Sequence, residues 1–106
     1  MLVEDNDLVR ESLEQTLSKW GLQVHTFAEA TPALRALALR RYDAVLSDGR
    51  LPGVMNGLGL LAQCASVQPA SCMRILMTGE PVDGLGTLPA GITSLQKPVR
   101  RPRTER

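Results

Sequence analysis

Apolar residues follow a helical period in the first third of the chain, beginning just after residue 6. Charged and polar side chains fill the other positions between residues 7 and 20. This spacing predicts an amphipathic helix over 7–20. Asn6 or Asp7 can cap its start and Gly21 can end it. The apolar face is expected to consist of Val9, Leu13, Leu17 and Trp20.

A second helical pattern follows Thr31 and Pro32. A hydroxyl residue that can cap, followed by proline at the first helical position, is a typical helix start. The pattern predicts a helix over 32–41, with an inward face of Leu34, Leu37 and Ala38. A third helix is predicted over about 58–65, after a glycine-rich loop.

Short apolar runs between these helices predict strands. They cover residues 1–3, 22–27, 43–48, 74–79 and 92–97. Strands that alternate with helices over short connections favour a parallel sheet with helices on both faces. Near-continuous apolar runs are typical of parallel strands that are buried on both faces. The predicted fold class is therefore α/β, a doubly wound parallel sheet.

Polar side chains that could bind a ligand or react lie where these strands end. Glu4 and Asp5 follow the first run, and Asp48 closes the run over 43–48 immediately before a turn. Thr78 and Lys97 end the last two strands. In open α/β sheets, ligands bind outside the carboxyl ends of the strands. We therefore expect three acids, one hydroxyl and one ammonium to meet at one rim.

This set of groups suits phosphoryl transfer. Three clustered carboxylates repel one another and favour a hard divalent cation such as Mg²⁺. A hydroxyl and a lysine can hold phosphoryl oxygens, and the central carboxylate can act as a nucleophile. The sequence contains neither the GxxxxGK[ST] phosphate loop nor the GxGxxG dinucleotide fingerprint.

Composition narrows the function classes. The 106 residues suffice for one domain, and 43% hydrophobic with only 3% aromatic residues predicts an aliphatic core. The net charge of +1 indicates no strong field for nucleic acid or membranes. No apolar run approaches the roughly 20 residues of a membrane span. Cys64 and Cys72 are too few for a disulfide framework, so we expect reduced, buried or partly buried thiols and a cytoplasmic location, with a disulfide between the two as the lesser alternative.

Four motifs in this order resemble the receiver domain of two-component response regulators. They are LVEDN, VLSDGRLPG, ILMTG and LQKP. The resemblance covers about residues 1–99 and implies a flavodoxin-like, five-stranded parallel sheet in the order 2-1-3-4-5, flanked by five helices. It also implies a sensor histidine kinase as the phosphodonor.

The resemblance assigns a role to each rim residue by its position. Asp48 is expected to be phosphorylated and also to be one of the metal ligands. Glu4 and Asp5 are expected to bind Mg²⁺, with Asp5 the more direct ligand. Arg50 is expected to offer its backbone carbonyl to the same metal. Thr78 and Lys97 are expected to bind the phosphoryl group.

Several features depart from the usual receiver pattern. The loop after Asp48 is one residue longer than the commonest form, as in receivers of hybrid sensor histidine kinases. Ser94 stands where receivers usually carry an aromatic switch residue. Glycines and prolines predict a weak fourth helix over 81–91. The chain offers no apolar stripe after residue 99, so a missing or truncated fifth helix is predicted, with residues 100–106 an arginine-rich tail.

Plainer interpretations compete with these assignments. Asp48 could be a solvated loop acid, Thr78 an ordinary strand-end hydroxyl and Lys97 a surface lysine. The acidic pair could serve only the helix dipole. His25 is expected to be a strand surface residue, and the tail a solvated segment rather than a nucleic-acid contact.

Three functions follow from these patterns. The first is a non-enzymatic phosphoacceptor, which would contact nucleic acid only through a separate output domain and would not contact membranes. The second is a degenerate receiver that acts as an interaction or homodimerisation module. The third is a metal-dependent phosphohydrolase. The third is disfavoured because Arg50 occupies the position where such enzymes carry a second acid.

Overall fold

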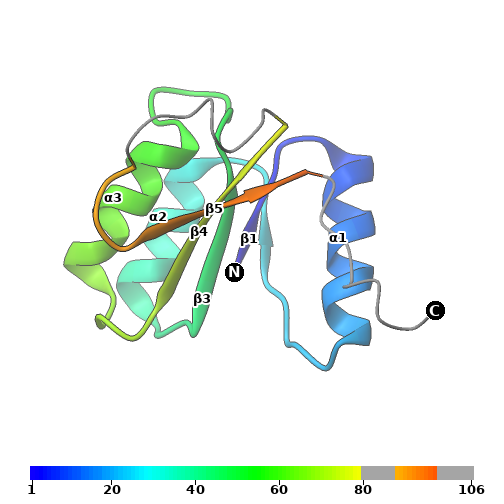
Figure 1. Ribbon diagram of the computed structural model, residues 1–106, viewed down its shortest axis with the longest axis horizontal. Coiled ribbons are helices and arrows are strands. Elements are labelled where there is room, and N and C mark those ends of the chain that lie inside the picture. The colour runs from blue at the N-terminus through cyan, green and yellow to red at the C-terminus, as the bar shows by residue number, and fades with distance from the viewer. Residues whose placement is uncertain (80–87, 98–106) are drawn as a thin grey trace.

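A computed structural model describes residues 1–79 and 88–97 of the chain. It shows a five-stranded sheet with α1 on one face and α2 and α3 on the other (Figure 1). The elements are β1 (Leu2–Val3), α1 (Asp7–Lys19), β2 (Thr26–Phe27), α2 (Ala30–Leu39), β3 (Ala44–Asp48), α3 (Gly57–Val67), β4 (Met73–Thr78) and β5 (Ile92–Gln96).

The strands are all parallel and follow the order β2-β1-β3-β4-β5. This confirms the predicted sheet topology. The segment predicted to form a weak fourth helix includes residues 80–87, and the segment where the fifth helix is predicted to be missing or truncated is residues 98–106. Both stretches lie outside the described residues.

Helix α1 forms where the apolar period predicts it. The Asn6 side chain caps its start by accepting a hydrogen bond from the Val9 amide at 3.0 Å. The chain leaves the helix through Gly21, whose φ of +90° suits glycine. Leu13 and Leu17 are buried as expected, whereas Trp20 is 36% exposed and contributes less to packing than the pattern predicted.

Strand β2 and helix α2 differ from the prediction. Strand β2 covers two residues instead of 22–27, because its neighbour β1 offers only two residues for pairing. Helix α2 begins two residues earlier than predicted, and Glu29 stands at the cap without a side-chain hydrogen bond. Thr31 and Pro32 therefore lie within the first turn, where proline is tolerated.

The buried face of α2 also differs from the predicted one. Ala30, Ala33 and Leu37 are buried, whereas Ala38 is exposed. The prediction that Ala38 points inward was wrong because the buried stripe runs through Ala30, Ala33 and Leu37, and Ala38 lies about 100° around the helix from Leu37, at the edge of that stripe.

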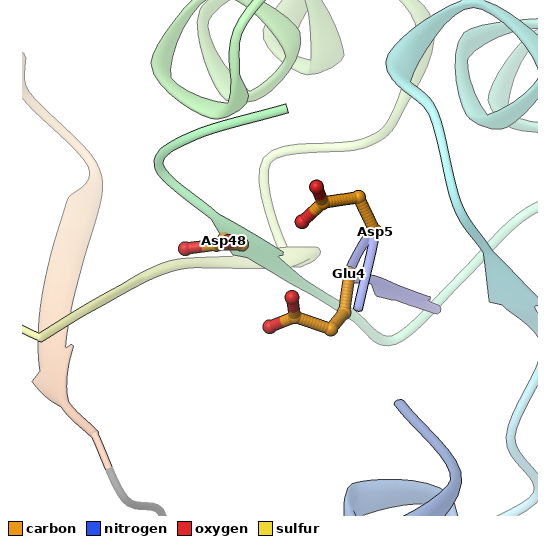
Figure 2. Close-up of side chains that lie close together, drawn as sticks. All are labelled: Glu4, Asp5 and Asp48. Atoms are coloured by element: carbon orange, nitrogen blue, oxygen red, sulfur yellow. The ribbon is translucent and has the colours of Figure 1, made fainter. Parts of the chain in front are cut away.

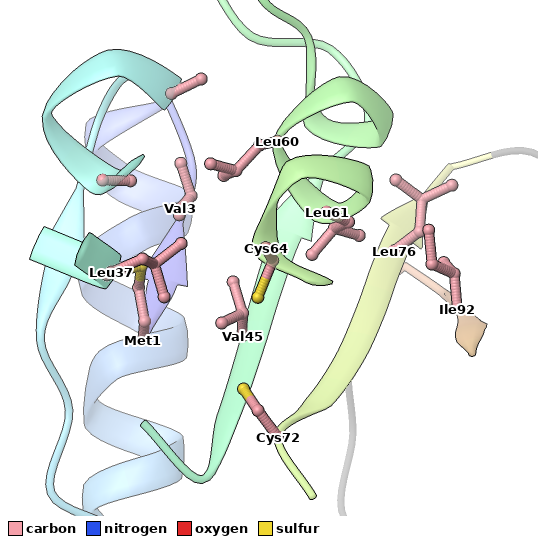
Figure 3. Close-up of a cluster of buried hydrophobic side chains, with 12 residues drawn as sticks. Met1, Val3, Leu37, Val45, Leu60, Leu61, Cys64, Cys72, Leu76 and Ile92 are labelled. Carbon is pink, nitrogen blue, oxygen red and sulfur yellow. The ribbon is translucent and has the colours of Figure 1, made fainter. Parts of the chain in front are cut away.

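The core consists of two unequal clusters, one on each face of the sheet. The larger cluster joins α2 and α3 to the sheet and includes Leu37, Val45, Leu60 and Leu61 (Figure 3). The smaller cluster lies under α1 around Leu2, Leu13 and Met77. No helix in the described part of the chain is long and apolar enough to cross a membrane.

Candidate functional site

Three carboxylates meet at the carboxyl ends of β1 and β3. Oxygen atoms of Glu4, Asp5 and Asp48 all lie within 4.8 Å of one another. Figure 2 shows Glu4 and Asp5 leaving the end of β1 beside Asp48 at the end of β3. The structure thus brings together the three acids that the strand-end argument predicted would meet.

Strand register explains this meeting. Strands β1 and β3 are parallel neighbours, and Val3 pairs with Ser47. The next residue on each strand is an acid, so Glu4 and Asp48 end adjacent strands at the same level. A one-residue slip would turn these side chains to the opposite face of the sheet.

Lys97 reaches into the same rim from the end of β5. Its Nζ lies 2.6 Å from Glu4 Oε1 and 3.4 Å from Asp48 Oδ1. Burial by itself would lower the pKa of Lys97, but the hydrogen bond that Lys97 donates to Glu4 and the charges of Asp48 and Glu4 outweigh this effect. The pKa of Lys97 is therefore raised above its ordinary value of 10.5.

Glu4 is held more firmly than the sequence suggested. Its side chain is buried, with Oε1 on Lys97 and Oε2 accepting a hydrogen bond from the Asn6 amide at 3.2 Å. Arg10 donates to the Glu4 backbone carbonyl at 2.8 Å. Asp5, by contrast, is exposed to solvent. The expectation that Asp5 is the more direct metal ligand stays a prediction.

Thr78 and Arg50 lie near the rim by chain position. Thr78 ends β4, is partly buried, and its carbonyl accepts a hydrogen bond from the Lys97 amide at 2.7 Å. Arg50 lies two residues after Asp48 and is exposed. Their roles toward phosphate and metal still rest on the resemblance.

Sequence reasoning missed the part played by Gly57. A Cβ built on Gly57 would collide with the Asp48 carbonyl oxygen and come within 2.8 Å of Ser47 Oγ. The Gly57 amide donates to the Gly49 carbonyl at 3.2 Å, which closes the loop behind the acid. The available signal was the Asn56–Gly57 pair before an apolar run, a helix cap followed by the smallest residue.

The donor set fits a hard divalent cation. Oxygen ligands from three carboxylates are what Mg²⁺ and Ca²⁺ prefer, and Mg²⁺ commonly binds one or two carboxylates while keeping waters. The partly exposed Asp48 side chain and the exposed Asp5 leave an approach from solvent.

The sheet order and the acidic rim define a CheY-like receiver fold. The chain belongs to the response regulator receiver domain family, whose sequence model matches residues 1–104. It is 36% identical over 95 residues to the C4-dicarboxylate transport transcriptional regulatory protein DctD of Rhizobium meliloti, which covers 90% of this chain and 19% of DctD. The chain thus spans about a fifth of the length of that relative.

Solved structures agree with this assignment. A CheY-like receiver domain from Methylobacillus flagellatus superposes with a TM-score of 0.81 at 28% identity, covering 93% of this chain and 85% of that one. The receiver domain of a sensor histidine kinase from Pseudomonas aeruginosa, solved with a magnesium ion in its active-site cleft, gives a TM-score of 0.73 at 31% identity. That match covers 93% of this chain and 84% of the other.

Proposed function

We propose that this domain accepts a phosphoryl group on Asp48 from the phosphohistidine of a sensor histidine kinase, with Mg²⁺ bound at the acidic rim. The observation that carries the proposal is the cluster of Glu4, Asp5 and Asp48 with Lys97 beside it. The magnesium-bound relative supports the choice of cation.

Phosphoryl transfer to Asp48 requires only a few groups from the protein. An Asp48 oxygen attacks phosphorus, the phosphorus–nitrogen bond of phosphohistidine breaks, and the imidazole leaves with the electron pair. Mg²⁺, when bound, neutralises charge on the phosphoryl oxygens. Asp5, Glu4 and Asp48 would hold it, with the Arg50 carbonyl as a further ligand. Lys97 and Thr78 would bind the remaining phosphoryl oxygens.

The long loop after Asp48 supports the proposal that the parent protein is a hybrid sensor histidine kinase. We also propose a cytoplasmic location, and a domain that ends near residue 99 and precedes an arginine-rich tail. On this proposal the domain assists only its own phosphorylation and dephosphorylation. Transcriptional output would belong to a separate domain, as in the regulators that this chain resembles.

Incubation with acetyl phosphate and Mg²⁺, followed by intact-mass measurement, tests this function. The parent chain should gain one phosphoryl group, and the gain should disappear with excess chelator. Asp48→Asn keeps the shape and removes the nucleophile, so it should gain none. Asp43→Asn, an exposed acid before β3, is the matched control and should be labelled like the parent.

The outcomes separate the competing functions. Labelling of Asp48→Asn at the parent's level would show that another residue accepts phosphate. A folded parent that takes no phosphoryl group would favour the degenerate interaction module. Turnover of many equivalents without a lasting adduct would indicate a phosphohydrolase.

A further inference from the structure

Two cysteines face one another in the core at the end of β4 opposite the acidic rim. Cys64 lies on the inner side of α3, and Cys72 directly precedes β4. Both are buried and free. Figure 3 shows their sulfur atoms turned toward one another beside Val45. Both side chains line the same small cavity, so the fold places two soft donors beside one another.

A small cavity gives this pair an approach from outside. It has a volume of about 140 Å³, and its walls include Cys64, Cys72 and Arg74. Pro69 and Ala70, which are exposed, also line it. A water molecule occupies about 30 Å³ in the liquid, so an ion of similar size fits.

We propose that Cys64 and Cys72 form a two-sulfur site for a soft, thiophilic monovalent cation, for which Cu(I) is the probe. Thiolates select soft ions such as Cu(I), whereas structural zinc sites take four ligands. In the described part of the chain, the acidic rim is the only group of three or more candidate histidine, cysteine or acid ligands. The thiol pair therefore suits an ion that binds stably with only two sulfur ligands.

Binding is an exchange of protons for the ion, with no change of oxidation state. Burial raises the pKa of Cys64 to about 11 and also raises the pKa of Cys72, so both thiols are protonated at neutral pH. Two S–H bonds break, two S–Cu bonds form, and two protons leave to solvent. The product carries one negative charge, which the neighbouring Arg74 guanidinium offsets.

The site is separate from the phosphoacceptor rim. Cys72 precedes the first residue of β4, whereas Thr78 ends that strand at the rim. A soft cation at the thiols and Mg²⁺ at the acids should therefore bind independently. Failure of either proposal leaves the other standing.

The test is an anaerobic titration of the fully reduced chain with Cu(I) in competition with a chromophoric Cu(I) chelator. The parent should withdraw one equivalent and develop sulfur-to-copper charge-transfer absorption in the ultraviolet. Cys64→Ser and Cys72→Ser should each lose both signals. Met73→Leu removes the exposed sulfur next to Cys72 and should behave like the parent.

Circular dichroism and a cooperative thermal unfolding transition establish that each variant is folded. Where a serine variant does not fold, Cys64→Ala or Cys72→Ala replaces it. Retention of tight one-to-one binding by either single cysteine variant would overturn the proposal. So would a folded, reduced parent that leaves all Cu(I) on the chelator.

Discussion

The ammonium of Lys97 lies between two carboxylates that come from distant parts of the chain. It is 2.6 Å from Glu4 and 3.4 Å from Asp48. Because Glu4 is buried, removing its partner would leave a carboxylate with poor access to water, which is costly. One ammonium thus offsets part of the negative charge of the three carboxylates at the rim.

The raised pKa of Lys97 predicts a loss of stability at alkaline pH. Its contribution to the free energy of unfolding is fully present below the ordinary value of 10.5 and is lost as the pH rises through the higher folded value. Urea unfolding of the parent and of Lys97→Met should therefore differ by a constant amount up to about pH 10 and converge above it.

Subtracting the two unfolding curves removes the contribution of cysteine and tyrosine ionisation, which both proteins share. Lys19→Met, an exposed lysine in the last turn of α1, is the control and should follow the parent. A difference between parent and Lys97→Met that does not shrink as the pH rises above 10.5 would contradict a Lys97 charge coupled to the acids.

At the scale of elements, the start of α3 is fixed against the end of β3. Gly57 lies so close to the Asp48 carbonyl that no side chain fits between them. The Asn56 side chain caps the same helix by accepting from the Gly59 amide at 2.8 Å. The position of the Asp48 backbone is therefore tied to the first turn of α3.

Gly57→Ala should damage both stability and phosphorylation. The added methyl group must push α3 away from β3, and overpacking of this kind costs about 1–3 kcal/mol. Chemical unfolding and acetyl phosphate labelling would measure the two effects. Gly59→Ala, where the nearest atom is the flexible Met55 side chain at 3.2 Å, should be close to neutral. Equal behaviour of the two variants would show that β3 and α3 adjust freely.

Gln68 joins the end of α3 to the end of α2. Its Nε2 donates to the Leu37 and Arg40 carbonyls, both at 2.7 Å, and its Oε1 accepts from the Tyr42 amide at 2.9 Å. The side chain is buried, so three backbone groups depend on one amide. Carbonyl groups at the carboxyl end of α2, which have no partner within that helix, thus receive hydrogen bonds from a side chain at the end of α3.

Gln68→Ala should lower the free energy of unfolding by about 2–3 kcal/mol, because buried backbone groups lose their partners. Gln63→Ala, on the exposed side of the same helix, should change it by less than about 0.5 kcal/mol. Urea denaturation would compare them. Similar values for both variants would mean that water replaces the Gln68 amide without cost.

At the scale of the whole molecule, the two faces of the sheet are covered unequally. Helices α2 and α3 cover the larger cluster, whereas α1 covers the smaller one (Figure 1). On strand β5 at the edge of the sheet, Leu95 is 37% exposed. An apolar surface of a few hundred Å² commonly marks an interaction site.

We therefore predict that the chain either self-associates or is only marginally stable as a monomer. Light scattering over a concentration series, together with binding of a fluorescent apolar dye, would measure this. Leu95→Lys should reduce association or dye binding, and Thr93→Lys on the same strand is a polar control. A strictly monomeric, dye-negative chain of ordinary thermal stability would refute the prediction.

The sequence by itself determined the order of elements and the rim residues. Apolar periods located the three described helices, and strand ends identified Glu4, Asp5 and Asp48 as neighbours. This worked because parallel strands place their carboxyl ends at one edge, so chain position alone fixes the level of a side chain. Local periodicity was less reliable at boundaries, as the early start of α2 shows.

Only the tertiary structure decided which groups touch. The Lys97–Glu4 pair spans 93 residues, the Gln68 amide reaches α2 across 31 residues, and Cys64 meets Cys72 across a loop. Gly57 has no side chain, so its contact with Asp48 could not be inferred from the type of residue. Such contacts depend on how helices pack on a twisted sheet, and that packing is set by the whole core and not by the spacing of any one segment.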